Sequence, residues 1–147
     1  VIQALASVVL VALFVVSVLD HRFDWSDLPS WAVPLGDAGV VAGFLLICRV
    51  FLENSFAAAT VRVEAGQRVI DTGPYRLVRH PMYAGAIVLF AAVPPALDSA
   101  WGWLAIAPLI VVLIARLTDE ERHLDRHLAG YPAYRLRVPW RLMPGVW

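Results

Sequence analysis

Four stretches with almost no charge constrain the fold of this chain more than any other feature. Residues 1–19 carry no charge, and their length is close to the ~20 apolar residues with which an α-helix crosses the hydrocarbon core of a bilayer. Residues 38–52 contain one charged side chain, Arg49, and residues 82–97 and 99–115 contain none. Because 60% of all residues are hydrophobic and 16% are charged, against about 25% charged in soluble domains, we expect an all-α integral membrane protein.

These stretches predict about four transmembrane helices in a single domain of residues 1–147, at residues 1–19, 38–58, 82–97 and 99–117. The last two predicted helices are short and are separated by Asp98, so we expect a tight helical hairpin with Asp98 at its exposed tip. Pro108 is expected to kink the last helix. Because the chain begins with Val1 and not with Met, we also expect further N-terminal sequence, which could add another span.

The distribution of arginine predicts the orientation of these helices. All 12 basic residues are Arg. Residues 20–37 contain one Arg and four Asp, whereas residues 53–80 contain four Arg and the tail from residue 116 contains six. By the positive-inside rule, the segments 59–81 and 116–147 are expected on the cytoplasmic side and the acidic loop on the outer side. The small size and the exclusive use of Arg favour a bacterial inner (plasma) membrane.

Composition and spacing exclude several other classes of function. The net charge is zero and no basic stripe is interleaved with aromatic residues, so nucleic-acid binding is not expected. Four scattered His residues and no convergent set of carboxylates give no spacing of metal ligands. Cys48 is alone within a span and is expected to be a buried, inert thiol.

The first polar cluster is the segment 73–85, which reads GPYRLVRHPMYAG. Gly73 and Pro74 predict a turn, because Pro fixes φ and Gly allows positive φ. Pro81 is expected in the first turn of the next helix, where its missing N–H costs no hydrogen bond. The free N–H groups of that helix start, with His80 beside them, would attract an anionic group such as a carboxylate.

The second polar cluster follows the last apolar stretch. Arg116 and Glu120 share one helix face, and Glu121 is angled towards the next face. Gly130 is expected to end this helix before a turn at residues 131–134 and a basic, aromatic tail. Two simpler interpretations stay open here. Arg116 and Glu120 would also suit an ordinary surface ion pair, and the tyrosines of both clusters would suit a membrane-interface belt.

In order along the chain, GPYRLVRHPMYAG, R-x-x-x-E-E, G-Y-x-x-Y and a V-P-x-R-x-x-P tail resemble the isoprenylcysteine carboxyl methyltransferase family. That family groups with the membrane phospholipid methyltransferases. The resemblance covers roughly residues 53–145. It implies a multi-span helical enzyme that binds S-adenosyl-L-methionine in a cytoplasmic pocket formed by the 53–80 loop and the C-terminal helix. A lipophilic or prenylated acceptor would enter this pocket from the bilayer.

The resemblance also implies individual site residues. Carried over by position, the cofactor contacts of the family fall on Gln67, Arg68, Val69, Ile70, Tyr75, His80, Pro81, Met82, Tyr83 and Glu121. The paired Arg and Glu of its catalytic centre fall on Arg116 and Glu121. Gln67 departs from the His that eukaryotic members often have at this place.

Methyl transfer is chemically consistent with these residues. The leaving sulfide departs neutral, so positioning supplies most of the catalysis. A carboxylate acceptor needs no base, and Arg116 could hold it bidentately. An amine acceptor would need deprotonation, for which Glu120, Glu121 and His80 are the candidates. Two other functions stay open: an NADPH-dependent membrane reductase of the sterol type, although no basic group clearly suits a 2′-phosphate, and a non-enzymatic small membrane protein.

Overall fold

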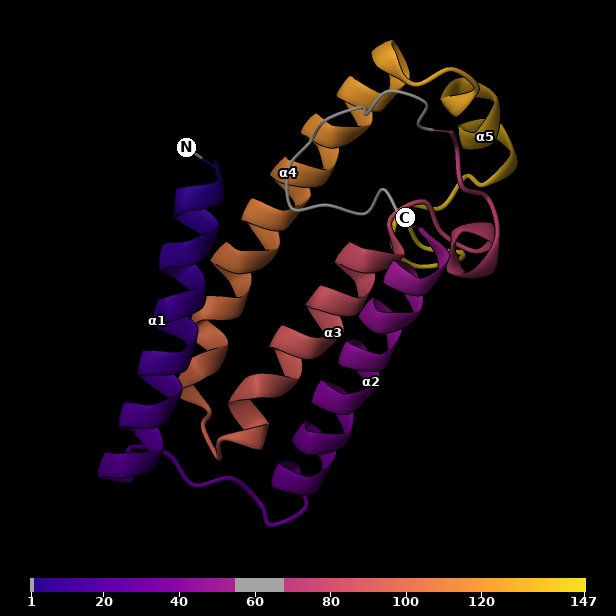
Figure 1. Cartoon of the computed structure of the whole chain (residues 1–147). Helices are drawn as coiled ribbons and strands as arrows, with labels where there is room; N and C mark the ends of the chain where they lie inside the picture. Colours follow the sequence, from indigo (N-terminus) through magenta and orange to yellow (C-terminus); the bar gives the residue numbers. More distant parts are fainter. Residues whose placement is uncertain (1, 55–67) are drawn as a thin grey trace.

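The computed structural model describes residues 2–54 and 68–147, and the described chain is all-α (Figure 1). Its helices are α1 (Ile2–Phe23), α2 (Ala32–Glu53), the 3₁₀ helix η1 (Gly73–Arg76), α3 (Pro81–Ala96), the 3₁₀ helix η2 (Trp101–Ala105), α4 (Ile106–His127) and α5 (Tyr131–Arg137). The four long helices alternate in direction, and α5 and the C-terminal tail lie beside one end of the bundle (Figure 1).

Three helices are long and apolar enough to cross a membrane: α1, α2 and the continuous helical stretch Trp101–His127. The fourth apolar helix, α3, has 16 residues and falls short of that length. The prediction of an all-α fold is therefore confirmed for the described residues, with three helices that could span a membrane where about four spans were predicted. Apolar composition predicted the positions of all four helices. Helix α3 differs from the others because it is shorter than the ~20 residues that cross a bilayer.

Two helices extend beyond the spans predicted for them. The helix predicted at 38–58 begins at Ala32 and ends at Glu53, because Pro34 fits a first helical turn and Asn54 has an extended backbone. Residues 55–58 of that prediction lie outside the described residues. Helix α4 continues past the predicted end of the span at 117 to His127, close to Gly130, where the sequence predicted that this helix would end.

Pro108 lies in the first turn of α4, which begins at Ile106 directly after η2. The kink expected at Pro108 stays a prediction. The chain reverses between α3 and η2 at Asp98, whose φ of 51° is in the left-handed region. As Figure 1 shows, α3 and α4 run antiparallel from this reversal.

Small residues let α2 and α3 pack closely along their length. A Cβ atom added at Gly43 would lie 2.6 Å from the backbone nitrogen of Leu89 and 2.8 Å from the carbonyl oxygen of Gly85. Gly36 and Gly39 face α3 in the same manner. Close approach of backbones at small residues is the usual basis of helix association within membranes.

Replacement of Gly43 by leucine is therefore expected to destabilise the protein by about 1–3 kcal/mol, the usual cost of overpacking. The matched control is Ala42→Leu, because Ala42 is the exposed neighbour on the same helix. Thermal unfolding of the detergent-purified proteins measures both. Equal melting temperatures for the two variants would contradict the close α2–α3 contact.

The C-terminal end of α1 is fixed by a buried carboxylate. Asp20 was predicted to lie in the acidic loop on the outer side, but α1 continues past it and its side chain is 0% exposed. Its Oδ2 accepts hydrogen bonds from Ser26 Oγ at 2.7 Å, Ser99 Oγ at 2.6 Å and the backbone nitrogen of Trp101 at 3.0 Å. These bonds join α1 to the start of η2, as capping groups join a loop to a helix.

Candidate functional site

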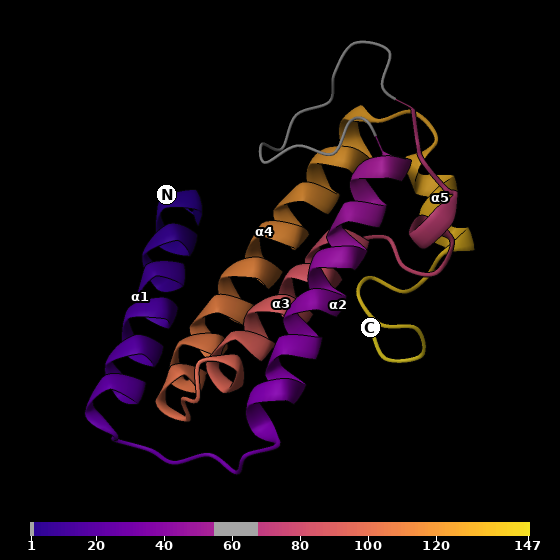
Figure 2. The same ribbon diagram turned by 60° about the horizontal axis from the view of Figure 1, so that its bottom comes forward.

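The two polar clusters of the sequence meet at one end of the bundle. In both views, α5 and the C-terminal tail lie beside the end of α2 and the start of α3 (Figures 1 and 2). The long α4 brings its charged second half to the same end. Two groups of polar contacts form there, and we call them the Glu121 group and the Arg116 group.

The Glu121 group surrounds one buried carboxylate. Glu121 is 4% exposed. Its Oε1 accepts from Arg79 Nε at 2.7 Å and lies 3.2 Å from His80 Nε2, and its Oε2 accepts from Arg141 Nε at 2.8 Å. Both oxygens of this carboxylate are therefore engaged by basic side chains, as a buried charge requires.

Arg79 connects this group to the C-terminal tail. Its Nη1 donates to the carbonyl oxygens of Val138 at 2.8 Å and Pro139 at 2.7 Å. Its backbone N–H donates to the carbonyl of Trp140 at 2.9 Å. The tail is thus held against the start of α3 by both the main chain and the side chain of one arginine.

The Arg116 group links three helices through partly buried side chains. Tyr83 Oη donates to Glu120 Oε2 at 2.6 Å and accepts from Arg116 Nε at 3.0 Å. Arg116 Nη1 also donates to the side-chain oxygen of Gln3 on α1. Arg116 and Glu120 are half-buried, whereas Tyr83 is buried. This group therefore offers a guanidinium and a carboxylate that are fixed by one phenol and still partly accessible.

Hydrogen bonds of tyrosine side chains connect α5 to η1 and η1 to the end of α2. Tyr134 Oη donates to the carbonyl of Tyr75 at 2.8 Å, and Tyr75 Oη accepts from Asn54 Nδ2 at 2.8 Å. Burial raises the pKa of the Tyr131 and Tyr134 phenols above their ordinary values. Both hydroxyls therefore stay protonated near neutral pH and do not act as bases.

The predicted cofactor residues are placed as follows. Gln67 lies outside the described residues, and Arg68 is exposed. The others are buried (His80, Pro81, Tyr83 and Glu121) or half-buried (Val69, Ile70, Tyr75 and Met82). Val69 packs against the buried side chains of α5. The predicted roles of these residues stay predictions.

The predicted catalytic pair is divided between the two groups. The described contacts of Arg116 join it to Tyr83 and Gln3, and those of Glu121 join it to Arg79, His80 and Arg141. Residues four apart on a helix share a face, so Arg116 lies on the same face as Glu120 and not on the face of Glu121.

Sequence reasoning gave no site role to Arg79, Arg141 or Gln3. Arg79 and Arg141 lie inside the quoted motifs, which was a usable signal, whereas Gln3 carried none.

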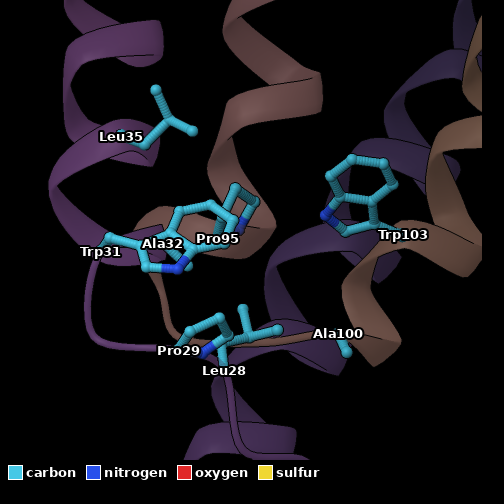
Figure 3. A pocket seen from close by; sticks show the side chains of 8 residues that line it. All are labelled: Leu28, Pro29, Trp31, Ala32, Leu35, Pro95, Ala100 and Trp103. Atoms are coloured by element: carbon cyan, nitrogen blue, oxygen red, sulfur yellow. The ribbon is translucent and has the colours of Figure 1, made fainter.

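A separate apolar pocket lies at the opposite end of the bundle (Figure 3). Its volume is about 580 Å³, and side chains from the α1–α2 loop, the start of α2, the end of α3 and η2 line it. Trp31 and Trp103 stand on two sides of it. Carbon atoms dominate the lining, so this pocket suits hydrocarbon and offers no group for acid–base chemistry. Within residues 2–54 and 68–147, no three His, Cys, Asp or Glu side chains gather to hold a metal ion.

Comparison with known proteins gives two matches. The model of the phospholipid methyltransferase family matches residues 31–130, more than half of the chain. The Delta(14)-sterol reductase TM7SF2 of Mus musculus is 26% identical over 91 residues, a match that covers 60% of this chain and 22% of the mouse protein. The chain thus corresponds to about a fifth of the length of that relative.

Proposed function

The chain belongs to the phospholipid methyltransferase family, and we propose that it transfers a methyl group from S-adenosyl-L-methionine to a lipophilic acceptor at the cytoplasmic side of the membrane. Membership in this family and three helices of membrane-spanning length indicate an integral membrane enzyme. The four alternating helices support a topology in which α3 also crosses, where the bilayer is locally thinned. Both polar groups then face the cytoplasm, in agreement with the arginine distribution.

The observation that carries this proposal is the Arg116 group, a half-buried guanidinium and carboxylate fixed by Tyr83. A bound S-adenosyl-L-methionine supplies an electrophilic methyl group on a sulfonium ion. The charged groups of this cofactor fit the protein groups at this end of the bundle. The Glu120 carboxylate suits the ammonium or sulfonium of the cofactor, and the start of α3 suits its carboxylate. The remaining contacts are those the resemblance assigns to residues 67–70, 75 and 80–83.

The contacts also favour a division of roles between the two glutamates. Three basic side chains already engage Glu121, so we assign it to holding the tail against the start of α3. Glu120 has a phenol as its described partner and is half-buried, so we assign it the cofactor-facing role that the resemblance places on Glu121. Glu121 would then stabilise the fold around the site, and the adjacent Glu120 would contact the cofactor.

Arg116 is the residue we assign to the acceptor. A guanidinium held at Nε by Tyr83 has other N–H donors with which it can orient a carboxylate. A carboxylate is a nucleophile at neutral pH, so this arrangement transfers a methyl group without moving a proton. An isoprenylcysteine-like carboxylate is therefore the acceptor we favour. For a lipid amine, Glu120 is the nearest candidate base.

A second candidate function is an NADPH-dependent reductase, because the mouse relative is a sterol reductase. The two functions differ in their ligand. Calorimetric titration of the detergent-purified protein with S-adenosylhomocysteine, and in parallel with NADPH, separates them. We expect binding of S-adenosylhomocysteine and none of NADPH. NADPH binding alone, or binding of neither ligand by folded protein, would refute the proposed function.

Glu120→Gln is expected to weaken binding of S-adenosylhomocysteine by roughly tenfold or more, because a charge-assisted hydrogen bond to the ammonium is lost. Asp119→Asn is the matched control: Asp119 is the exposed acid one residue earlier on α4, and its loss of charge is expected to leave the affinity unchanged. The same titration measures both variants. Equal affinities for Glu120→Gln and the wild type would remove Glu120 from the cofactor site.

A further inference from the structure

We infer that Gln3, in the first turn of α1, is a specificity-determining residue of the acceptor site. Its side-chain oxygen occupies an N–H of Arg116 that the oxygen of the acceptor takes over when it binds. This inference rests on the proposed function, because it assumes that Arg116 receives the acceptor. What the inference adds is that the Gln3 amide oxygen competes with the acceptor for this N–H group of Arg116.

The first support is the geometry of the Arg116 side chain. Its Nε donates to Tyr83 Oη at 3.0 Å, which fixes the guanidinium against α3, and its Nη1 donates to Gln3 Oε1 on α1. An amide oxygen and a carboxylate oxygen are acceptors of the same kind, and they differ in charge. The Gln3 amide therefore stands where an acceptor oxygen would make the same bond, and a charged oxygen would make it more strongly.

The second support is the way α1 is held. Among residues 2–12 none is buried, whereas the buried residues of this helix are Leu13, Ser17 and Asp20 in its second half. Leu13 enters the core, and Asp20 fixes the C-terminal end through three hydrogen bonds. Gln3 itself is exposed and precedes Val9 and Leu10, which pack against the core, so its side chain can release Arg116 without uncovering core residues.

The third support is the position of α1 relative to the family match. That match begins at residue 31, so Gln3 lies outside it while Arg116 lies inside it. In Figures 1 and 2, α1 lies along α4, and its N-terminal end stands apart from α2. A lipophilic acceptor that arrives from the bilayer would then meet Arg116 next to α1. Selection of the acceptor would be a property that α1 adds to the family-matched helices.

Competition predicts opposite effects for two substitutions. Gln3→Ala removes the bond that the acceptor must replace, so the KM for a carboxylate acceptor is expected to fall roughly three- to tenfold with kcat maintained. Gln3→Glu places a charged competitor on Arg116, so the KM is expected to rise by about tenfold. Ser7→Ala is the control, because Ser7 lies one turn away and its hydroxyl bonds to the backbone oxygen of Gln3. It is expected to behave as the wild type.

The experiment uses the whole protein in detergent, with N-acetyl-S-farnesylcysteine as the carboxylate probe. Binding of the probe is measured in the presence of saturating S-adenosylhomocysteine, and KM and kcat are measured for methyl transfer to it. Tighter binding and lower KM in Gln3→Ala, with the reverse in Gln3→Glu, support the inference. Unchanged affinity and KM in Gln3→Ala overturn it, and so does a fall in kcat at constant KM, which would make Gln3 a support of Arg116.

Failure of the inference is distinguishable from failure of the proposed function. Wild-type protein that binds S-adenosylhomocysteine and is insensitive to both Gln3 substitutions keeps the function and loses the inference. Protein that binds S-adenosylhomocysteine but in no variant binds the farnesylated carboxylate also overturns the inference. Folded protein that binds no S-adenosylhomocysteine refutes the proposed function itself.

Discussion

Replacement of Glu121 by alanine is expected to destabilise the protein by about 3–5 kcal/mol, because the carboxylate that compensates buried basic side chains is lost. The side chains of Arg79 and His80 are each 4% exposed. Without Glu121, the Arg79 guanidinium would be a buried charge with carbonyl partners alone. Thermal unfolding of the detergent-purified variant, without ligand, measures the effect.

Three variants separate this role from the cofactor role that the resemblance assigns to Glu121. Asp119→Asn removes an exposed acid from the same helix and is expected to leave the melting temperature unchanged. Replacing Arg79 and Glu121 together by methionine removes both charges and is expected to recover much of the loss in stability. In Glu121→Gln, a normal melting temperature together with lost S-adenosylhomocysteine binding would contradict the structural role and return Glu121 to the cofactor site.

The apolar helices could be predicted from the sequence because their signal is local. Four apolar stretches correspond to α1, α2, α3 and α4, and Pro81 begins α3 as expected. The main error concerns a charged residue at a helix end. Asp20 is buried inside the fold although it stands at the end of an apolar stretch. A hydropathy scale gives the average preference of a residue type for water or for an apolar environment. It therefore cannot identify a charged residue that is buried because hydrogen bonds compensate its charge.

The site was predicted in part, for a related reason. The motifs brought His80, Tyr83 and Arg116 to one end of the bundle, where the structure also has them. What joins them depends on pairing between distant segments, such as the backbone bond of 2.9 Å from His80 to the carbonyl of Arg141. No local pattern encodes this contact. The i, i+4 spacing of Arg116 and Glu120 did encode a shared face, and an ordinary surface pair stayed open beside a role in the site.

Replacement of Arg116 by alanine is expected to lower turnover by about 100-fold, the usual cost of losing the group that orients a reacting partner. Arg116 is fixed by Tyr83 and is half-buried, so it meets an acceptor in one orientation. The affinity for S-adenosylhomocysteine is expected to stay within about twofold, because we assign the cofactor contacts to other residues. Methyl transfer to N-acetyl-S-farnesylcysteine measures turnover, and calorimetry measures cofactor affinity.

Arg116→Lys separates orientation from charge. Lysine keeps the positive charge but not the planar fork that holds a carboxylate and the phenol of Tyr83 together, so we expect only partial recovery of turnover. Arg122→Ala, at an exposed arginine on the same helix, is the control for a lost charge near the membrane surface. If Arg116→Ala and Arg122→Ala lowered turnover equally, the arginines would act through general electrostatics. If Arg116→Ala instead abolished S-adenosylhomocysteine binding, Arg116 would belong to the cofactor and the acceptor would need another anchor.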